Sequence, residues 1–116
     1  MESGVCAAGT LNALTVRCVC LDSVIGQLKV DIAKIDVEGF EEKVLMGAAR
    51  LLRDPRRRPG RIYIEVHPFA WPSAGTTSHS LITLLEDYGY DVRTLQGERV
   101  ETISEYGNVL AIARIQ

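Results

Sequence analysis

The segment VDIAKIDV, residues 30–37, constrains the fold more than any other part of the sequence. Most of its positions are apolar, as in a strand that other elements cover on both faces, so we place it near the centre of a sheet. From Glu41 onward apolar residues recur at helical spacing, while charged residues, Glu41 and Glu42 among them, take the other side of the predicted helix. RIYIEVHP, residues 61–68, is a second strand. Because a helix separates the two strands, we expect a parallel pair joined by a right-handed crossover.

Flanking segments add further predicted strands and helices. LTVRCVCL, residues 14–21, is rich in β-branched and apolar residues and is predicted to be a strand. Asp22 and Ser23 then offer a cap for a short helix. A loop rich in Pro, Gly and Ser follows the second strand of the central unit, and loops of that length are often functional. The remaining predicted elements are a helix over residues 81–88 and strands over residues 90–95 and 108–115.

The chain has the size of one domain, because 116 residues can bury one modest core. We assign residues 14–116 to a single α/β domain and expect residues 1–13 to form a poorly ordered leader. The 13 basic and 15 acidic side chains give a net charge of −2, so no overall field favours nucleic acid or an acidic membrane as a partner. The three arginines at 56–58 are expected to form a solvated turn. No stretch reaches the roughly 18 apolar residues of a membrane span.

The cysteines at positions 6, 18 and 20 bear on the cellular compartment. Their odd number and close spacing match neither a disulfide framework nor paired zinc ligands. We expect them to be small buried side chains, with Cys18 and Cys20 on one face of a strand. A reducing, cytoplasmic location follows as the expectation.

Acidic side chains and one histidine follow the two strands of the central unit. In open α/β sheets, ligands collect beyond the carboxyl ends of the strands. Asp36 and Glu38 lie at the end of the first strand. Glu65 and His67 lie at the equivalent place on the second. Because side chains alternate along a strand, each pair should point to one face, and the pairs should meet if the strands adjoin. The structural alternative is that Glu38 caps the following helix and Lys34 neutralises a neighbouring acid.

The segment VDIAKIDVEGFEEKVLMGAARLL, residues 30–52, combines a strand ending in K-I-D-V-E-G with a helix of the E-x-x-V-L-x-G-A kind. In this it resembles the signature of the FkbM-type methyltransferases, which depend on S-adenosylmethionine. Three flanking segments are similar to the family as well: VRCVCLDSVI, RPGRIYIEVHP and LITLLEDYGYDV. The resemblance covers roughly residues 14–116.

This resemblance implies a Rossmann-like (class I methyltransferase) sheet, mostly parallel, with an antiparallel last strand inserted between the two before it. It implies O-methylation of a small hydroxyl-bearing metabolite or sugar, with S-adenosylmethionine as the cofactor. Asp36 would face donor and acceptor, and His67, whose ordinary pKa is near neutrality, would be the base. Phe69 and Trp71 suit either packing over the sheet edge or a substrate lid. The substrate-binding set would be Glu38, Glu65, Phe69 and Trp71.

The sequence departs from the family in the first half of the domain. A glycine-rich turn after the first strand and an acid after the second, which together hold the donor, are not present. The chain would therefore correspond to the later half, either as the carboxyl-terminal portion of a longer enzyme or as a shortened relative without activity. The strand at residues 30–37 would then expose an edge, through which we expect homodimerisation or docking onto a partner.

Two other functions stay open from the residues alone. A non-catalytic interaction module would dock this half-sheet onto a partner, helped by the apolar and aromatic loop at residues 69–71. A metal-dependent hydrolase would use D-x-E on one strand and E-x-H on the next as oxygen and imidazole ligands, and metal-assisted methyl transfer is a variant of that idea. The favoured interpretation assigns no metal ligand.

Overall fold

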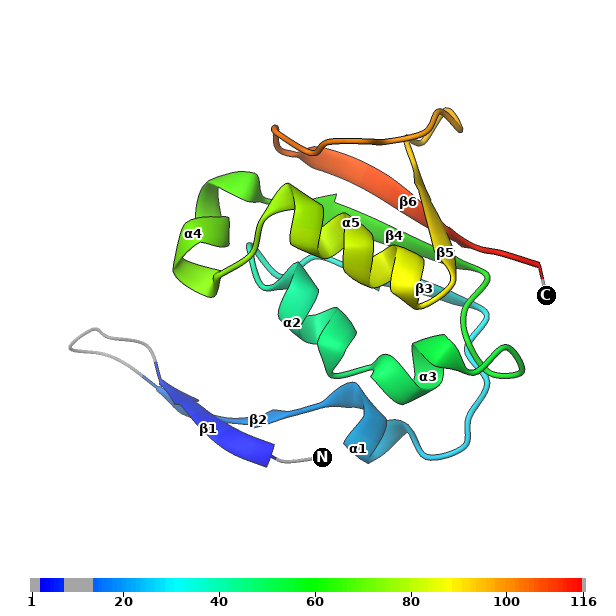
Figure 1. Cartoon of the computed structure of the whole chain (residues 1–116). Helices are drawn as coiled ribbons and strands as arrows, with labels where there is room; N and C mark the ends of the chain where they lie inside the picture. Colours follow the sequence, from blue (N-terminus) through cyan, green and yellow to red (C-terminus); the bar gives the residue numbers. More distant parts are fainter. Residues whose placement is uncertain (1–2, 8–13, 116) are drawn as a thin grey trace.

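The computed structural model describes residues 3–7 and 14–115. Its main sheet has four strands, β3 (Ile32–Ile35), β4 (Arg61–Val66), β5 (Tyr90–Arg93) and β6 (Gly107–Ala113), in the order β3-β4-β6-β5 (Figure 1). β3 and β4 are parallel, whereas β6 runs antiparallel to both of its neighbours. The mixed α/β fold, the parallel pairing of the two strands joined through a helix and the insertion of the last strand between the two before it are therefore confirmed.

Helices pack on the sheet and enclose the core with it (Figure 1). α5 (Ser78–Asp87) packs against β5, and α2 (Glu41–Met46) packs against α5. Alternate residues of β4 are buried, as expected for a strand with one covered face. The centre of the core consists of fully buried side chains from β4 and these two helices, namely Ile62, Ile64, Val66, Leu45, Leu81 and Leu85.

β3 lies at an edge of this sheet, so its predicted central position is wrong. Ile32 is 60% exposed, whereas Ile35 is buried in the core. The apolar run indicated a strand covered on both faces, whereas half of the β3 residues are exposed. Among the described residues, β3 pairs with β4 alone. The exposed edge that the family resemblance implied for this strand is present.

The predicted helix after Glu41 is broken into α2 and α3 (Ala49–Arg53) at Gly47 and Ala48. Asp22 explains where α3 begins, because its carboxylate accepts hydrogen bonds from the amides of Arg50 (2.7 Å) and Leu51 (3.1 Å). The sequence suggested Asp22 as a cap for the short helix that contains it, α1 (Leu21–Ile25). It caps a different helix instead, which ties α1 to α3.

The loop that follows β4 contains two short helices, the 3₁₀ helix η1 (Pro68–Ala70) and α4 (Trp71–Ala74). α5 then begins after Thr77, whose hydroxyl accepts from the Ser80 amide, while the Ser80 hydroxyl accepts from the Thr77 amide. This reciprocal capping box fixes the start of α5.

A separate antiparallel hairpin is formed by β1 (Ser3–Ala7) and β2 (Thr15–Val19). β1 is a strand within the predicted leader, whose remaining residues, 1–2 and 8–13, lie outside the described ones. The division into leader and domain stays a prediction. Cys18 and Cys20 are half-buried, and Cys20 follows β2 instead of lying in it, so the expected buried pair on one strand face is wrong. Cys18 is disulfide-bonded, which the sequence interpretation did not foresee.

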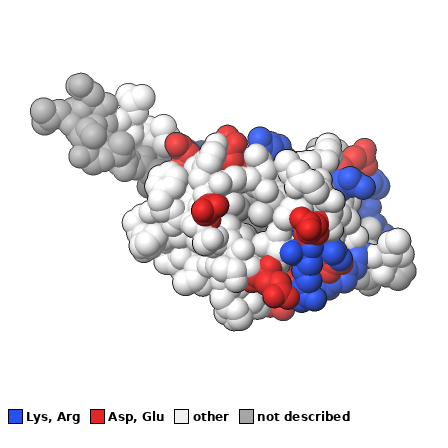
Figure 2. Space-filling model, turned by 90° about the horizontal axis from the view of Figure 1, so that it is seen from above, with Lys and Arg blue, Asp and Glu red and all other residues white. Residues whose placement is uncertain are grey.

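The surface in Figure 2 is mostly uncharged, and most of its basic side chains gather at one end together with acidic ones. Among the described residues, Arg114 and Arg93 both pair with Asp91, at 3.0 and 3.9 Å. Every helix among the described residues is too short or too polar to span a bilayer.

Candidate functional site

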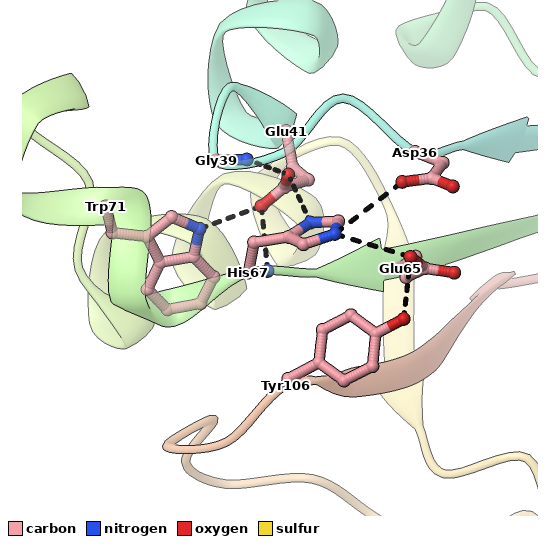
Figure 3. Close-up of polar contacts among 7 residues, drawn as sticks. All are labelled: Asp36, Gly39, Glu41, Glu65, His67, Trp71 and Tyr106. Carbon is pink, nitrogen blue, oxygen red and sulfur yellow. Dashed lines mark hydrogen bonds and ion pairs between the residues drawn. The ribbon is translucent and has the colours of Figure 1, made fainter.

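Asp36, Glu65 and His67 converge where β3 and β4 end (Figure 3). His67 Nε2 lies 3.3 Å from Glu65 Oε2 and 3.6 Å from Asp36 Oδ1. We call these three residues the acid–imidazole centre. The imidazole is almost completely buried, whereas the Asp36 side chain is 46% exposed, so the centre opens to solvent on the Asp36 side. The parallel pairing of β3 and β4 brings their ends together, as the sequence predicted.

Glu41 lies on the other side of the imidazole and has no exposed surface (Figure 3). Its carboxylate accepts hydrogen bonds from the Gly39 amide at 2.6 Å, the Trp71 indole at 2.8 Å and the His67 amide at 3.4 Å. His67 Nδ1 is 3.2 Å from Glu41 Oε2. These contacts satisfy a buried carboxylate that would otherwise be strongly unfavourable.

Glu41 fixes one nitrogen of the His67 ring. An ionised carboxylate can only accept, so Nδ1 carries a proton in its contact with Glu41. Nε2 is directed toward Asp36 and Glu65. The centre thus presents one nitrogen and two carboxylate groups to the same small volume.

The surroundings shift two pKa values at the site. Burial alone would raise the pKa of Glu41, but the hydrogen bonds from Trp71, Gly39 and His67 outweigh it and lower that pKa. Burial alone would lower the pKa of His67, but Glu41 raises it through its hydrogen bond and its charge, and the charges of Asp36 and Glu65 raise it further. Glu41 therefore stays ionised, and His67 binds a proton more readily than a free imidazole.

Two exposed aromatic rings border the centre. The Tyr106 hydroxyl donates to Glu65 Oε2 at 2.9 Å, and its ring centroid is 5.3 Å from that of His67. This bond, followed by the charge of Glu65, raises the pKa of Tyr106. The Phe69 ring meets the imidazole edge-on at 5.9 Å. Tyr106 is 63% exposed and Phe69 is 74% exposed, so both are accessible to a ligand.

The other residues proposed from sequence lie differently. Glu38 is exposed, in the left-handed conformation with φ of +48°, and is in none of the polar contacts of Figure 3. Trp71 is 3% exposed and supports Glu41 from inside the protein.

Sequence reasoning missed Glu41 and Tyr106. Helical periodicity placed Glu41 on the solvent side, although its position directly after the turn at Gly39 was visible. The structure also gives Tyr106 a place beside the centre, because it precedes Gly107, which pairs with Val66 in the sheet.

An apolar groove of about 880 Å³ lies between the β2–α1 segment and the β3–α2 segment. Val37, next to Asp36 in the sequence, and Phe40 are part of its lining. Most of the lining is apolar, and Lys43 is the charged residue among the described residues that line it. The groove therefore suits apolar groups.

The family model described as "Methyltransferase FkbM domain" matches residues 8–92, which is more than half of the chain. The matched range includes the acid–imidazole centre and Glu41, whereas Tyr106 lies beyond it. No curated protein and no solved structure matched the sequence.

Proposed function

Because the chain belongs to the family of methyltransferase FkbM domains, we propose that the acid–imidazole centre is the acceptor site for methyl transfer to a hydroxyl oxygen. The observation that carries this proposal is the orientation of His67, with Nδ1 bound to Glu41 and Nε2 facing two carboxylates. Methylation of a hydroxyl requires a group that binds the oxygen and a group that takes its proton. The centre contains both.

The described residues support a simple division of tasks. A carboxylate oxygen of Asp36, on the open side, accepts a hydrogen bond from the acceptor hydroxyl and orients its oxygen. The proton then passes to the centre, where His67 Nε2 and the carboxylate oxygens are the available bases. Glu41 is a positioning residue, because it holds the imidazole in place without facing the acceptor.

The family implies S-adenosylmethionine as the methyl donor and a Rossmann-like sheet, but the described residues do not form a donor site. A strand-to-helix glycine turn could bind such a ligand through a free amide, yet the Gly39 amide is already bound by Glu41. Space is also missing there, since a Cβ on Gly39 would lie 2.6 Å from the Ala70 Cβ. The apolar groove offers no carboxylate for ribose hydroxyls among its described residues. We therefore assign only the acceptor side of the reaction to these residues.

Small hydroxyl-bearing metabolites or sugars fit the acceptor side best. Asp36 and Glu65 supply carboxylate acceptors for neighbouring hydroxyl groups, and the exposed rings of Tyr106 and Phe69 supply flat apolar surfaces beside them. This combination binds a polar ring with apolar faces.

The test combines binding with transfer. Ligand-observed NMR with a panel of sugars and hydroxylated metabolites should find acceptors whose binding weakens at least about tenfold in Asp36→Asn. Asp31→Asn, an exposed acid just before β3, is the matched control and should bind normally. Labelled methyl transfer from S-adenosylmethionine is then measured with each acceptor found. The proposal would be refuted if no compound of the panel bound and none was methylated. Binding that Asp36→Asn leaves unchanged would refute it as well.

The exposed edge of β3 supports a second proposal, that the chain forms a homodimer or docks onto a partner there. β3 is an edge strand, and Ile32 on it is 60% exposed. Unpaired strand edges of this kind favour pairing with another chain. Size-exclusion chromatography with light scattering should show association that Ile32→Lys reduces. A monomer at all concentrations would contradict the proposal.

A further inference from the structure

The geometry of the acid–imidazole centre points to a metal site: we propose that it binds one divalent transition-metal ion through His67 Nε2 and one carboxylate oxygen each from Asp36 and Glu65. These three ligand atoms all lie within 4.8 Å of one another. Ion binding does not depend on methyl transfer, and only the role of the ion in the reaction rests on the proposed function.

The two separations from His67 Nε2 are close to those of ligands around one ion. Metal–nitrogen and metal–oxygen bonds of about 2.1 Å place neighbouring ligand atoms roughly 3.0–3.4 Å apart in octahedral or tetrahedral geometry. His67 Nε2 is 3.3 Å from the Glu65 oxygen and 3.6 Å from the Asp36 oxygen. Movement of the half-exposed Asp36 side chain would bring its oxygen into this range of both other ligand atoms.

Glu41 prepares His67 as a ligand. Histidines that bind metals usually donate the other ring N–H to a carboxylate, which fixes the tautomer and makes the ligating nitrogen more basic. Here Nδ1 meets Glu41 at 3.2 Å, and Glu41 is itself fixed by Trp71 and Gly39. This buried support makes the site more than a group of acids on the surface.

The local charge also favours a cation. Three carboxylates, those of Asp36, Glu41 and Glu65, surround a single imidazole. In the described part of the chain, the ion pairs of these carboxylates are with His67, with no lysine or arginine among their partners. Excess negative charge remains even when the imidazole is protonated, and a divalent ion would offset it.

The ligand set indicates the kind of ion. One imidazole with two carboxylates suits Mn²⁺, Fe²⁺ or Zn²⁺, whereas Ca²⁺ prefers six to eight oxygens. Three protein ligands leave coordination positions open, as in catalytic metal sites. These positions face the side on which Asp36 is exposed, where the acceptor would enter.

In the proposed reaction the ion would bind the acceptor hydroxyl and lower its pKa. Carboxylate oxygens of Asp36 and Glu65 that do not bind the ion remain available for the released proton. With the ion bound, Nε2 of His67 is a ligand and no longer a base. The metal site thereby specifies how the centre activates the hydroxyl.

Isothermal calorimetry with Mn²⁺ and with Zn²⁺ on the metal-free full chain, without donor or acceptor, tests ion binding directly. We expect one ion per chain, with affinity falling at least about tenfold in Asp36→Asn and in His67→Gln. Glu41→Gln, which removes the support of the ligand, should weaken binding by about 10–100-fold. Asp31→Asn and His79→Gln are the matched controls, because both residues are exposed and lie outside the centre, and both variants should bind as the wild type does.

Asp36→Asn keeps the test decisive if the buried variants fail to fold, since the Asp36 side chain is 46% exposed and circular dichroism can verify the fold of the variant. Absence of binding at millimolar Mn²⁺ and Zn²⁺ would overturn the metal site. Binding that Asp36→Asn does not weaken would overturn it as well. If either result overturned the metal site, acceptor binding by the metal-free chain would still support the proposed function. The two proposals can therefore be refuted independently.

Discussion

Replacing Glu41 by Gln tests the network behind the acid–imidazole centre, because it removes the charge and nearly keeps the shape. The buried carboxylate meets four nitrogen atoms: those of the Gly39 amide, the Trp71 indole, the His67 amide and the His67 ring. A glutamine side chain has one acceptor oxygen and one NH₂ donor. A glutamine can therefore replace only one of the two acceptor oxygens of the carboxylate.

The partners decide which orientation the glutamine takes. With its oxygen in place of Oε1, it keeps the bonds from the Trp71 indole and the His67 amide. Its NH₂ group then faces His67 Nδ1, which can accept after a change of tautomer, and the Gly39 amide, which cannot. One unsatisfied buried donor costs roughly 1–3 kcal/mol, and neutral bonds are weaker than bonds to a charge. We expect the free energy of unfolding to fall by about 2–4 kcal/mol.

Urea denaturation followed by circular dichroism measures this loss, and long-range ¹H–¹⁵N NMR reads the tautomer of neutral His67. We expect the proton to move from Nδ1 to Nε2, which would leave Nε2 unable to take a proton or bind an ion. Glu42→Gln is the matched control: Glu42 is the next residue, is also buried, and accepts a bond from the neutral Thr76 hydroxyl at 2.8 Å. The reasoning would be refuted if Glu41→Gln lowered the free energy of unfolding no more than Glu42→Gln does and left Nδ1 protonated.

Further predictions concern single residues. Trp71→Phe removes the indole bond to Glu41 and should lower the free energy of unfolding by at least about 1.5 kcal/mol, measured by circular dichroism; an unchanged value would contradict the network. Gly39→Ala should destabilise far more than Gly26→Ala, since both have positive φ but only Gly39 has a neighbour where the new Cβ would lie, at 2.6 Å; equal urea midpoints would count against this packing. Burial raises the pKa of Tyr90 to about 12 from 10.0, so the unfolded chain loses this proton first, and stability present below pH 10 should decline from pH 10 toward 12. Tyr90→Phe should flatten that decline in urea titrations, and an equally steep decline would contradict the assignment.

The location of the centre could be predicted from the sequence because it depends on few rules. Strands joined through a helix pair in parallel, and their ends meet at one edge of the sheet. Asp36 and His67 come together for that reason. The insertion of β6 between β4 and β5 was expected from the family resemblance, whereas local patterns alone did not determine it.

Glu41 could not be recognised because its partners are distant in the sequence. A charged residue opposite an apolar helical face usually contacts solvent, and this rule failed where Trp71 and His67, 30 and 26 residues away, supplied hydrogen bonds. Arg58 shows the same limit: its guanidinium is buried and donates to the carbonyls of Tyr88 and Arg114, although the arginine run suggested a solvated turn. Periodicity describes burial on average, while such networks depend on tertiary contacts.

The central claim is that the carboxylates of Asp36 and Glu65 surround the imidazole of His67. The most direct test is an NMR titration of the His67 imidazole in chelator-treated buffer, comparing the wild type with Asp36→Asn and Asp31→Asn. The account predicts a pKa above the ordinary value of 6.5 that falls in Asp36→Asn and is unchanged in Asp31→Asn. An ordinary or lowered pKa that does not respond to Asp36→Asn would contradict it.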